Sequence, residues 1–213
     1  MLFFPYEDIL SIKTSYCRVI FKYIILLFCI LNTMYKQITT YFIGSLSLFI
    51  LGIGLCCLIK PHGILANDGI SYYGIFSTTL IPYVICLLGP AFFFILAFLK
   101  LKKNTNLLKN FLLLFSFLLL GLVITPYSIN SFFNALHTTL GSALFALQLL
   151  LTGIIAIEYR HHRSLAYLWI IEFIAGVMCA LYITPQKGYL LEYQVVFQIA
   201  FSAILLIYTK LLQ

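Results

Sequence analysis

Residues 77–103 read STTLIPYVICLLGPAFFFILAFLKLKK, and this stretch decides the fold class. It begins with 23 residues that carry no charged side chain, and Lys100, Lys102 and Lys103 follow directly. A membrane-spanning helix needs about 20 consecutive, mainly apolar residues. The stretch therefore predicts a transmembrane helix over 77–99 that ends at a basic, cytoplasmic border.

The rest of the chain repeats this pattern. Four further stretches meet the same criterion, at 41–59, 135–157, 164–183 and 193–212. A sixth, at 111–129, meets Pro126, where we expect a kink or an early helix end because proline lacks a backbone donor. Of all 213 residues, 63% are hydrophobic and 9% charged, whereas soluble domains carry about 25% charged residues. We therefore predict an all-α polytopic bundle of six transmembrane helices within residues 34–213.

The basic residues indicate how this bundle is oriented. Six spans place the links at 100–110 and 158–163 on the same side of the membrane as the chain before residue 41 and the extreme C-terminus. Counted from residue 34 on, the other side holds only Lys60 and Lys187. The first side holds eight basic residues: Lys36, Lys100, Lys102, Lys103, Lys109, Arg160, Arg163 and Lys210. Since cytoplasmic loops carry the excess of Lys and Arg, we expect both termini in the cytoplasm and a multi-pass protein of a bacterial cytoplasmic membrane.

Residues 1–33 do not fit the six-span pattern. Their apolar core, residues 23–31, is only about nine residues long, which is too short to span a bilayer. This segment is interpreted either as an amphipathic helix on the cytoplasmic surface or as an upstream extension, with translation starting at Met34. A secretory signal or a seventh span is a further alternative.

Glu172 is the one acidic residue inside a predicted span, eight residues from its cytoplasmic end. An ionised carboxylate at mid-membrane costs about 2.5–3.5 kcal/mol on insertion scales, so we expect it to be neutral, paired or beside a hydrated cavity. Gln148 on the preceding span lies at a similar depth and is the predicted hydrogen-bond partner. Two interpretations stay open: a structural hydrogen bond between helices, or a site for a proton or substrate.

Polar residues recur along two spans at helical spacing. Residues that share one helix face lie three, four or seven positions apart, as do Asn134, His137, Gly141, Phe145, Gln148 and Thr152, and also Gln194, Gln198 and Ser202. The loop at 60–76 adds further polar groups, among them His62 and Asp68. These residues predict an outward-facing polar pocket under this loop, although residues near a membrane interface are commonly polar.

Small residues predict which helices touch. Ser142 with Ala146, and Gly176 with Ala180, form pairs four residues apart that permit close helix approach. We therefore expect the spans at 135–157 and 164–183 to be in contact.

Several kinds of chemistry have no support in the sequence. No nucleophile elbow, phosphate-binding loop or dinucleotide fingerprint occurs, and the His residues lack the spacing of a metal site. We therefore predict no catalytic residues, no cofactor and no metal. The net charge of +7 resides in links between apolar runs, which indicates contact with anionic lipid and no nucleic-acid partner.

Three strings carry a resemblance: NDGISYYG at 67–74, TTLIPY at 78–83, and FFNALHTTLGSALFALQLLL at 132–151. Over about residues 38–212 the chain resembles small six-helix bacterial membrane proteins of unknown function, distantly similar to the DRAM/Sfk-type membrane proteins of eukaryotes. The resemblance implies a fold and a membrane location. It implies no reaction.

Two functions follow as hypotheses. The first is a non-enzymatic membrane protein that binds lipids, other membrane proteins or a second copy of itself. The alternative is a small transporter or proton-coupled carrier that uses Glu172 and the outward-facing polar pocket.

Overall fold

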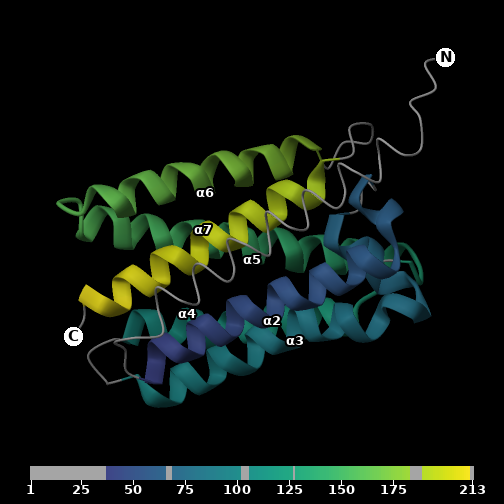
Figure 1. The fold of residues 1–213 in the computed structure, drawn as a ribbon, viewed down its shortest axis with the longest axis horizontal. Helices are drawn as coiled ribbons and strands as arrows, with labels where there is room; N and C mark the ends of the chain where they lie inside the picture. Colours follow the sequence, from purple (N-terminus) through teal and green to yellow (C-terminus); the bar gives the residue numbers. More distant parts are fainter. Residues whose placement is uncertain (1–36, 66–68, 102–105, 127, 183–188, 212–213) are drawn as a thin grey trace. The chain divides into compact units, whose positions relative to one another are not determined.

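The computed structural model describes residues 37–65, 69–101, 106–126, 128–182 and 189–211. These residues form six long α-helices and two short 3-10 helices (Figure 1), with no β-strand among them. In chain order the elements are α2 (Gln37–Ile59), η1 (Pro61–Leu65), η2 (Gly69–Ile75), α3 (Ser77–Lys100), α4 (Asn106–Ile124), α5 (Ser131–Glu158), α6 (Arg163–Tyr182) and α7 (Leu190–Leu211). All six long helices are long and apolar enough to cross a membrane, as predicted. The hypotheses for residues 1–33 lie outside the described residues.

Local sequence explains where the helices around Pro126 end and begin. The α4 helix stops at Ile124, so the early end predicted from Pro126 is confirmed. The next helix begins at Ser131, where the Asn130 side chain accepts a hydrogen bond from the Phe133 backbone N–H at 2.9 Å. This cap satisfies a donor that the first turn of a helix leaves free. At 28 residues, α5 is the longest of the described helices.

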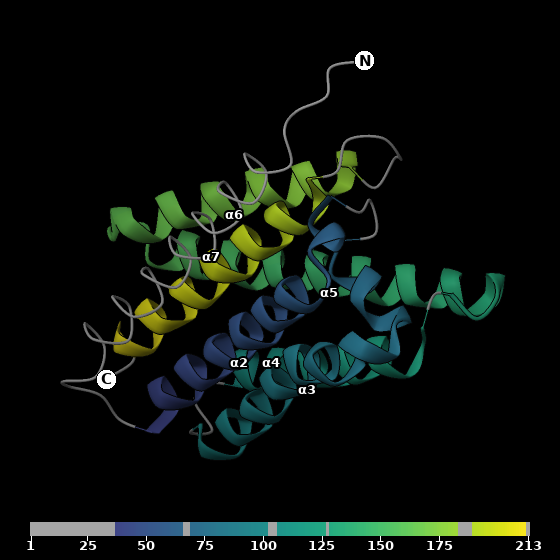
Figure 2. The ribbon, with the colours of Figure 1, turned by 45° about the vertical axis from the view of Figure 1, so that its right-hand side comes forward.

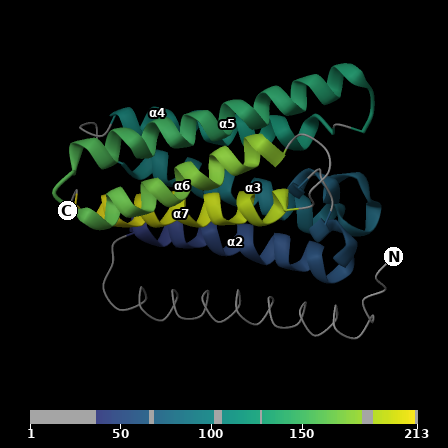
Figure 3. The same cartoon turned by 90° about the horizontal axis from the view of Figure 1, so that it is seen from above.

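The long helices follow one another around the bundle. Each packs against the next one in the chain, and α7 also packs against α2 and α5. Figures 2 and 3 show that α6 lies over the line along which α5 and α7 meet. The helices α2, α3, α4, α5 and α7 therefore surround the centre, and α6 covers the contact between α5 and α7 from outside.

The contact between α5 and α7 is called the α5–α7 seam below. Phe145 of α5 and Phe197 of α7 approach with ring centroids 4.5 Å apart, and Gln148 bonds to Gln198 one turn further along. Aromatic contact and paired amides thus hold the two helices together.

The predicted contact between α5 and α6 is confirmed, but three of the four small residues predicted to make it do not take part. Ser142 and Ala146 are exposed on α5, and Ala180 is exposed on α6. The contact uses Gly153 instead, because a Cβ there would lie 3.2 Å from the Trp169 indole nitrogen. Of the four predicted small residues, Gly176 alone faces the neighbouring helices.

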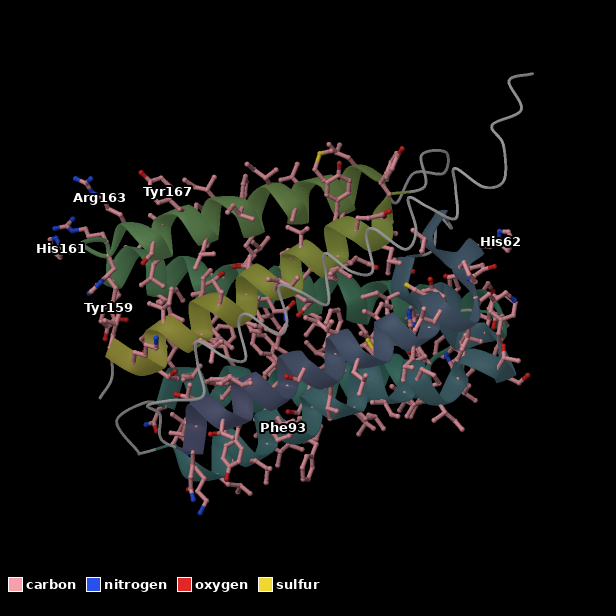
Figure 4. All side chains as sticks on the ribbon, in the orientation of Figure 1. His62, Phe93, Tyr159, His161, Arg163 and Tyr167 are labelled. Carbon is pink, nitrogen blue, oxygen red and sulfur yellow. The ribbon has the colours of Figure 1, made fainter. Side chains whose placement is uncertain are left out.

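The two ends of the bundle differ in chemistry. Figure 4 shows His62 at one end and Tyr159, His161 and Arg163 at the opposite end. We call them the η end, which carries η1 and η2, and the basic end, which carries the 158–163 link. Which end faces the cytoplasm stays a prediction from the charge count.

Candidate functional site

A cavity of about 80 Å³ lies in the centre of the bundle towards the η end. Its walls come from α2, η2, α3, α4, α5 and α7, and no described residue of α6 lines it. The polar groups that line it are uncharged hydroxyl, amide and imidazole side chains, together with one phenol and one thiol: Ser45, Ser71, Tyr83, Cys86, His137, Gln148, Gln194, Gln198 and Ser202. A cavity of this size with several polar partners has room for several water molecules.

The floor of the cavity is a reciprocal pair of amides. The Gln148 Nε2 donates to Gln198 Oε1 at 3.1 Å, and the Gln198 Nε2 donates to Gln148 Oε1 at 3.0 Å. Each amide therefore uses one donor and one acceptor on its partner, and each keeps a second N–H and a second lone pair. Those remaining groups can bind a polar molecule in the cavity.

The roof of the cavity is η2, which two helices hold in place. The backbone N–H of Ile70 donates to Gln194 Oε1 of α7 at 2.8 Å, and the Ser71 hydroxyl bonds to His137 Nε2 of α5 at 2.7 Å. Gly69 permits this arrangement, since its φ of +58° lies in the left-handed region, which glycine adopts readily. The η2 segment, residues 69–75, therefore closes the cavity at the η end.

His137 connects this roof to α4. Its Nδ1 lies 2.7 Å from the backbone oxygen of Thr125, and a carbonyl oxygen can only accept a hydrogen bond. Nδ1 therefore carries the proton in the neutral ring, so that Nε2 accepts and the Ser71 hydroxyl donates. The imidazole thus fixes the relative position of η2 and the end of α4.

Tyr73 anchors the outer side of the roof. It is fully buried, its hydroxyl lies 3.2 Å from Cys57 Sγ, and its backbone oxygen accepts a hydrogen bond from the Thr79 hydroxyl at 2.6 Å. Burial raises the pKa of the Tyr73 phenol above its ordinary value, and the neighbouring Cys57 adds to this shift. The phenol therefore stays protonated and neutral.

Glu172 belongs to α6 and does not line the cavity. The side chain is 0% exposed, and neither carboxyl oxygen has a hydrogen-bond partner among the described residues. The Thr152 side chain on α5 lies close enough to interact with this carboxyl, but its hydroxyl donates to the backbone oxygens of Gln148 and Leu149 at 2.9 and 3.2 Å. The predicted hydrogen bond between Glu172 and Gln148 is therefore wrong, because the Gln148 amide turns towards α7.

The other predicted site residues divide into three groups. His137, Gln148 and Gln198 come together around the cavity, as do Gln194 and Ser202. Asn134 and His62 are exposed and do not reach it, and Asp68 lies outside the described residues. Sequence reasoning missed Ser71 and Ser45, because a single serine in a loop or a span carries no periodic signal.

The fold and the cavity define a multi-pass integral membrane protein with a neutral polar centre. No family model, no curated protein and no solved structure matches the chain. The resemblance to small six-helix bacterial membrane proteins therefore stays a prediction. Within the part of the chain that the structure describes, no three His, Cys, Asp or Glu residues lie close enough together to hold a metal ion.

Proposed function

We propose that this protein is a non-enzymatic carrier that binds a small, uncharged polar solute in the central cavity. The observation that carries this proposal is the lining, which combines amides, hydroxyls and an imidazole, and none of the described residues in it is Asp, Glu, Lys or Arg. A solute that both donates and accepts hydrogen bonds satisfies such groups, whereas an ion would be left without a counter-charge. A molecule of the size and chemistry of urea or glycerol fits these requirements.

The position of the cavity supports transport as well as binding. It lies inside a helix bundle, a common place for small-molecule sites, and its roof is one short segment. Movement of η2 away from Gln194 and His137 would expose the solute at the η end. The charge count predicts that this end faces away from the cytoplasm, so the roof would be the outer gate.

The test is solute flux into vesicles. Purified protein is reconstituted into proteoliposomes, and volume recovery in urea or glycerol is followed by light scattering. We expect faster recovery than in protein-free vesicles, and a return to the protein-free rate in the double variant Gln148→Leu/Gln198→Leu. Equal rates with and without the wild-type protein for both solutes would contradict the proposal.

Thiol accessibility supplies a test that does not depend on the choice of solute. In a cysteine-free background, Ser202→Cys places a thiol on the cavity wall, and Ser142→Cys places one on the exposed face of α5. A water-soluble thiol reagent should label the first and spare the second, because only the cavity is hydrated. Labelling of Ser142→Cys alone would argue against a hydrated centre.

The orientation has its own test. A reporter that is active only in the cytoplasm should be active when fused after Lys103 or Arg163, and inactive within 60–76 or 184–192. The opposite pattern would place the roof on the cytoplasmic side.

Binding of another membrane protein, or of a second copy, remains the second candidate. The exposed face of α5 carries small residues one or two turns apart, Ala135, Thr139, Ser142 and Ala146, and helix interfaces in membranes favour such residues. Cross-linking of Ala146→Cys to itself, absent for the exposed Phe92→Cys on α3, would support self-association through this face of α5. Equal cross-linking of both variants would contradict it.

A further inference from the structure

Glu172 faces the α5–α7 seam from the outer side. Its neighbours one turn away on the same helix face, Trp169 and Gly176, both touch this region. The Trp169 indole N–H donates to the Leu149 backbone oxygen at 3.4 Å. A Cβ at Gly176 would lie 3.1 Å from the Phe197 ring of α7 and 3.2 Å from the Leu149 side chain of α5. The Glu172 carboxyl is thus enclosed between α6 and the two helices of the seam.

No charged residue in the described part of these three helices lies near this carboxyl. On α5 the charged residue is Glu158, the last residue of the helix, and on α6 it is Arg163, the first. On α7, Glu192 lies in the first turn and Lys210 in the last. The titratable thiol of Cys179 lies two turns along α6 and is buried. Among the described residues of α5, α6 and α7, the carboxyl therefore has neither a counter-ion nor a like charge beside it.

This environment makes each protonation state costly in a different way. An ionised carboxylate without a partner is strongly disfavoured in an apolar interior. A neutral carboxyl is tolerated there, yet it leaves its O–H donor unsatisfied, which costs about 1–3 kcal/mol. A buried polar group of this kind calls for an explanation. Ionisation requires water, and therefore requires the helices around Glu172 to separate.

The seam connects this carboxyl to the cavity. Thr152, beside Glu172, is one turn from Gln148 on α5, and its hydroxyl donates to the Gln148 backbone oxygen at 2.9 Å. Gln148 and its partner Gln198 face the cavity on the other side. Separation of these two amides would give water in the cavity a route towards Glu172. The same separation would open the cavity floor.

We infer that Glu172 is a reversible proton-binding site that controls the cavity floor: with the proton bound the α5–α7 seam stays closed, and with the proton released water enters and the seam opens. The link to solute movement rests on the proposed function. If the solute binds more tightly to the protein with an open seam, solute binding favours release of the proton from Glu172. By linkage, release of the proton strengthens solute binding by the same factor.

The proton site is tested first by chemistry that needs no solute. A hydrophobic carbodiimide takes up the proton of a neutral carboxyl on one nitrogen while a carboxyl oxygen bonds to its central carbon, and the adduct rearranges to a stable N-acylurea. In proteoliposomes, mass spectrometry should find this adduct on Glu172 at acidic pH and progressively less of it as the pH rises. Glu172→Gln should give no adduct on α6. An unmodified Glu172, or modification that is independent of pH, would overturn the inference.

The coupling is tested by urea flux across the same pH range. Wild-type flux should rise about tenfold from acidic to alkaline pH, within the usual range of coupling between two sites. Glu172→Gln should keep the low flux of the acidic wild type at every pH, because the amide cannot release a proton. Flux through Glu172→Gln that rises as in the wild type would overturn the coupling.

The two proposals fail in distinguishable ways. If the carbodiimide adduct depends on pH but the wild-type protein carries no urea or glycerol, the proton site stands and the carrier function is wrong. If the protein carries solute but Glu172 is not modified, the carrier function stands and the proton site is wrong. Modification of Glu192 in the same digest shows that the reagent reached the protein.

Discussion

The Gln148–Gln198 pair and Glu172 lie on opposite sides of one seam, and they differ in how their polar atoms are satisfied. The two amides exchange two hydrogen bonds of 3.0 and 3.1 Å. The carboxyl is more deeply buried than either and has no hydrogen-bond partner among the described residues. Hydrogen bonds that are made hold helices together, whereas a buried group that lacks them is a source of instability. Stability explains the first site, whereas the second calls for a different explanation.

The largest expected effect concerns the hydrogen-bonded pair Gln148 and Gln198. Gln198→Leu leaves the Gln148 amide unpaired and removes two interhelical hydrogen bonds. It should destabilise the protein by about 2 kcal/mol, since each such bond contributes about 0.6 kcal/mol and the orphaned amide adds its desolvation cost. Unfolding by SDS in mixed micelles measures the change.

The matched control for this variant is the double substitution. Gln148→Leu/Gln198→Leu removes both polar partners and should recover most of the lost stability. A double variant that is as unstable as the sum of the two single variants would show that the amides do not depend on each other.

The next effect has the opposite sign. Glu172→Leu removes a buried carboxyl that has no hydrogen-bond partner among the described residues, and the new side chain fills similar space in an apolar region. We expect a gain of about 1 kcal/mol in the free energy of unfolding, because an unsatisfied polar group is replaced by an apolar one. The same SDS titration measures it. A loss comparable to that of Gln198→Leu would mean that Glu172 has a partner after all.

The two sites also differ in how far the sequence predicted them. Apolar length predicted all six spans, and Pro126 predicted the end of α4, since both signals are local. Spacing also predicted that Gln194, Gln198 and Ser202 share a face, and all three line the cavity. Periodicity is enough for these conclusions because it defines which residues of one helix lie together.

The partner of Glu172 could not be predicted in this way. Gln148 and Glu172 lie at similar depths when counted from the link at 158–163, which suggested that they meet. Depth says nothing about the direction in which a residue points around its own helix axis relative to other helices. Gln148 faces α7 and the cavity, and Glu172 faces the outer side of the seam. Similarly, Ser71 and Thr125 contact His137 through tertiary structure that no spacing encodes.

A smaller effect is expected at the roof. Ser71→Ala removes the donor to His137 Nε2 and should cost about 1 kcal/mol, the typical contribution of one hydrogen bond. His137→Ala should lose as much or more, because the bond to the Thr125 backbone oxygen is lost as well. His62→Ala is the control, since His62 is an exposed residue of the same end. Equal melting temperatures for all three variants would show that η2 is not held by His137.

The smallest expected effect on stability is also the most informative about Glu172. Glu172→Gln replaces a neutral carboxyl by an amide of similar size, and both leave a donor without a partner. The free energy of unfolding should therefore change by no more than about 0.5 kcal/mol, as for substitutions that alter no contact, while the pH dependence of urea flux is lost. An ionised Glu172 would behave differently, because it would need a cationic partner within the protein, and removing one member of a buried ion pair costs about 3–5 kcal/mol. A large loss of stability in Glu172→Gln would therefore indicate that Glu172 is ionised and part of an ion pair. It would also contradict the proposal that its proton controls the seam. A silent substitution with lost pH dependence is the result expected if the carboxyl is retained for its proton and not for its packing.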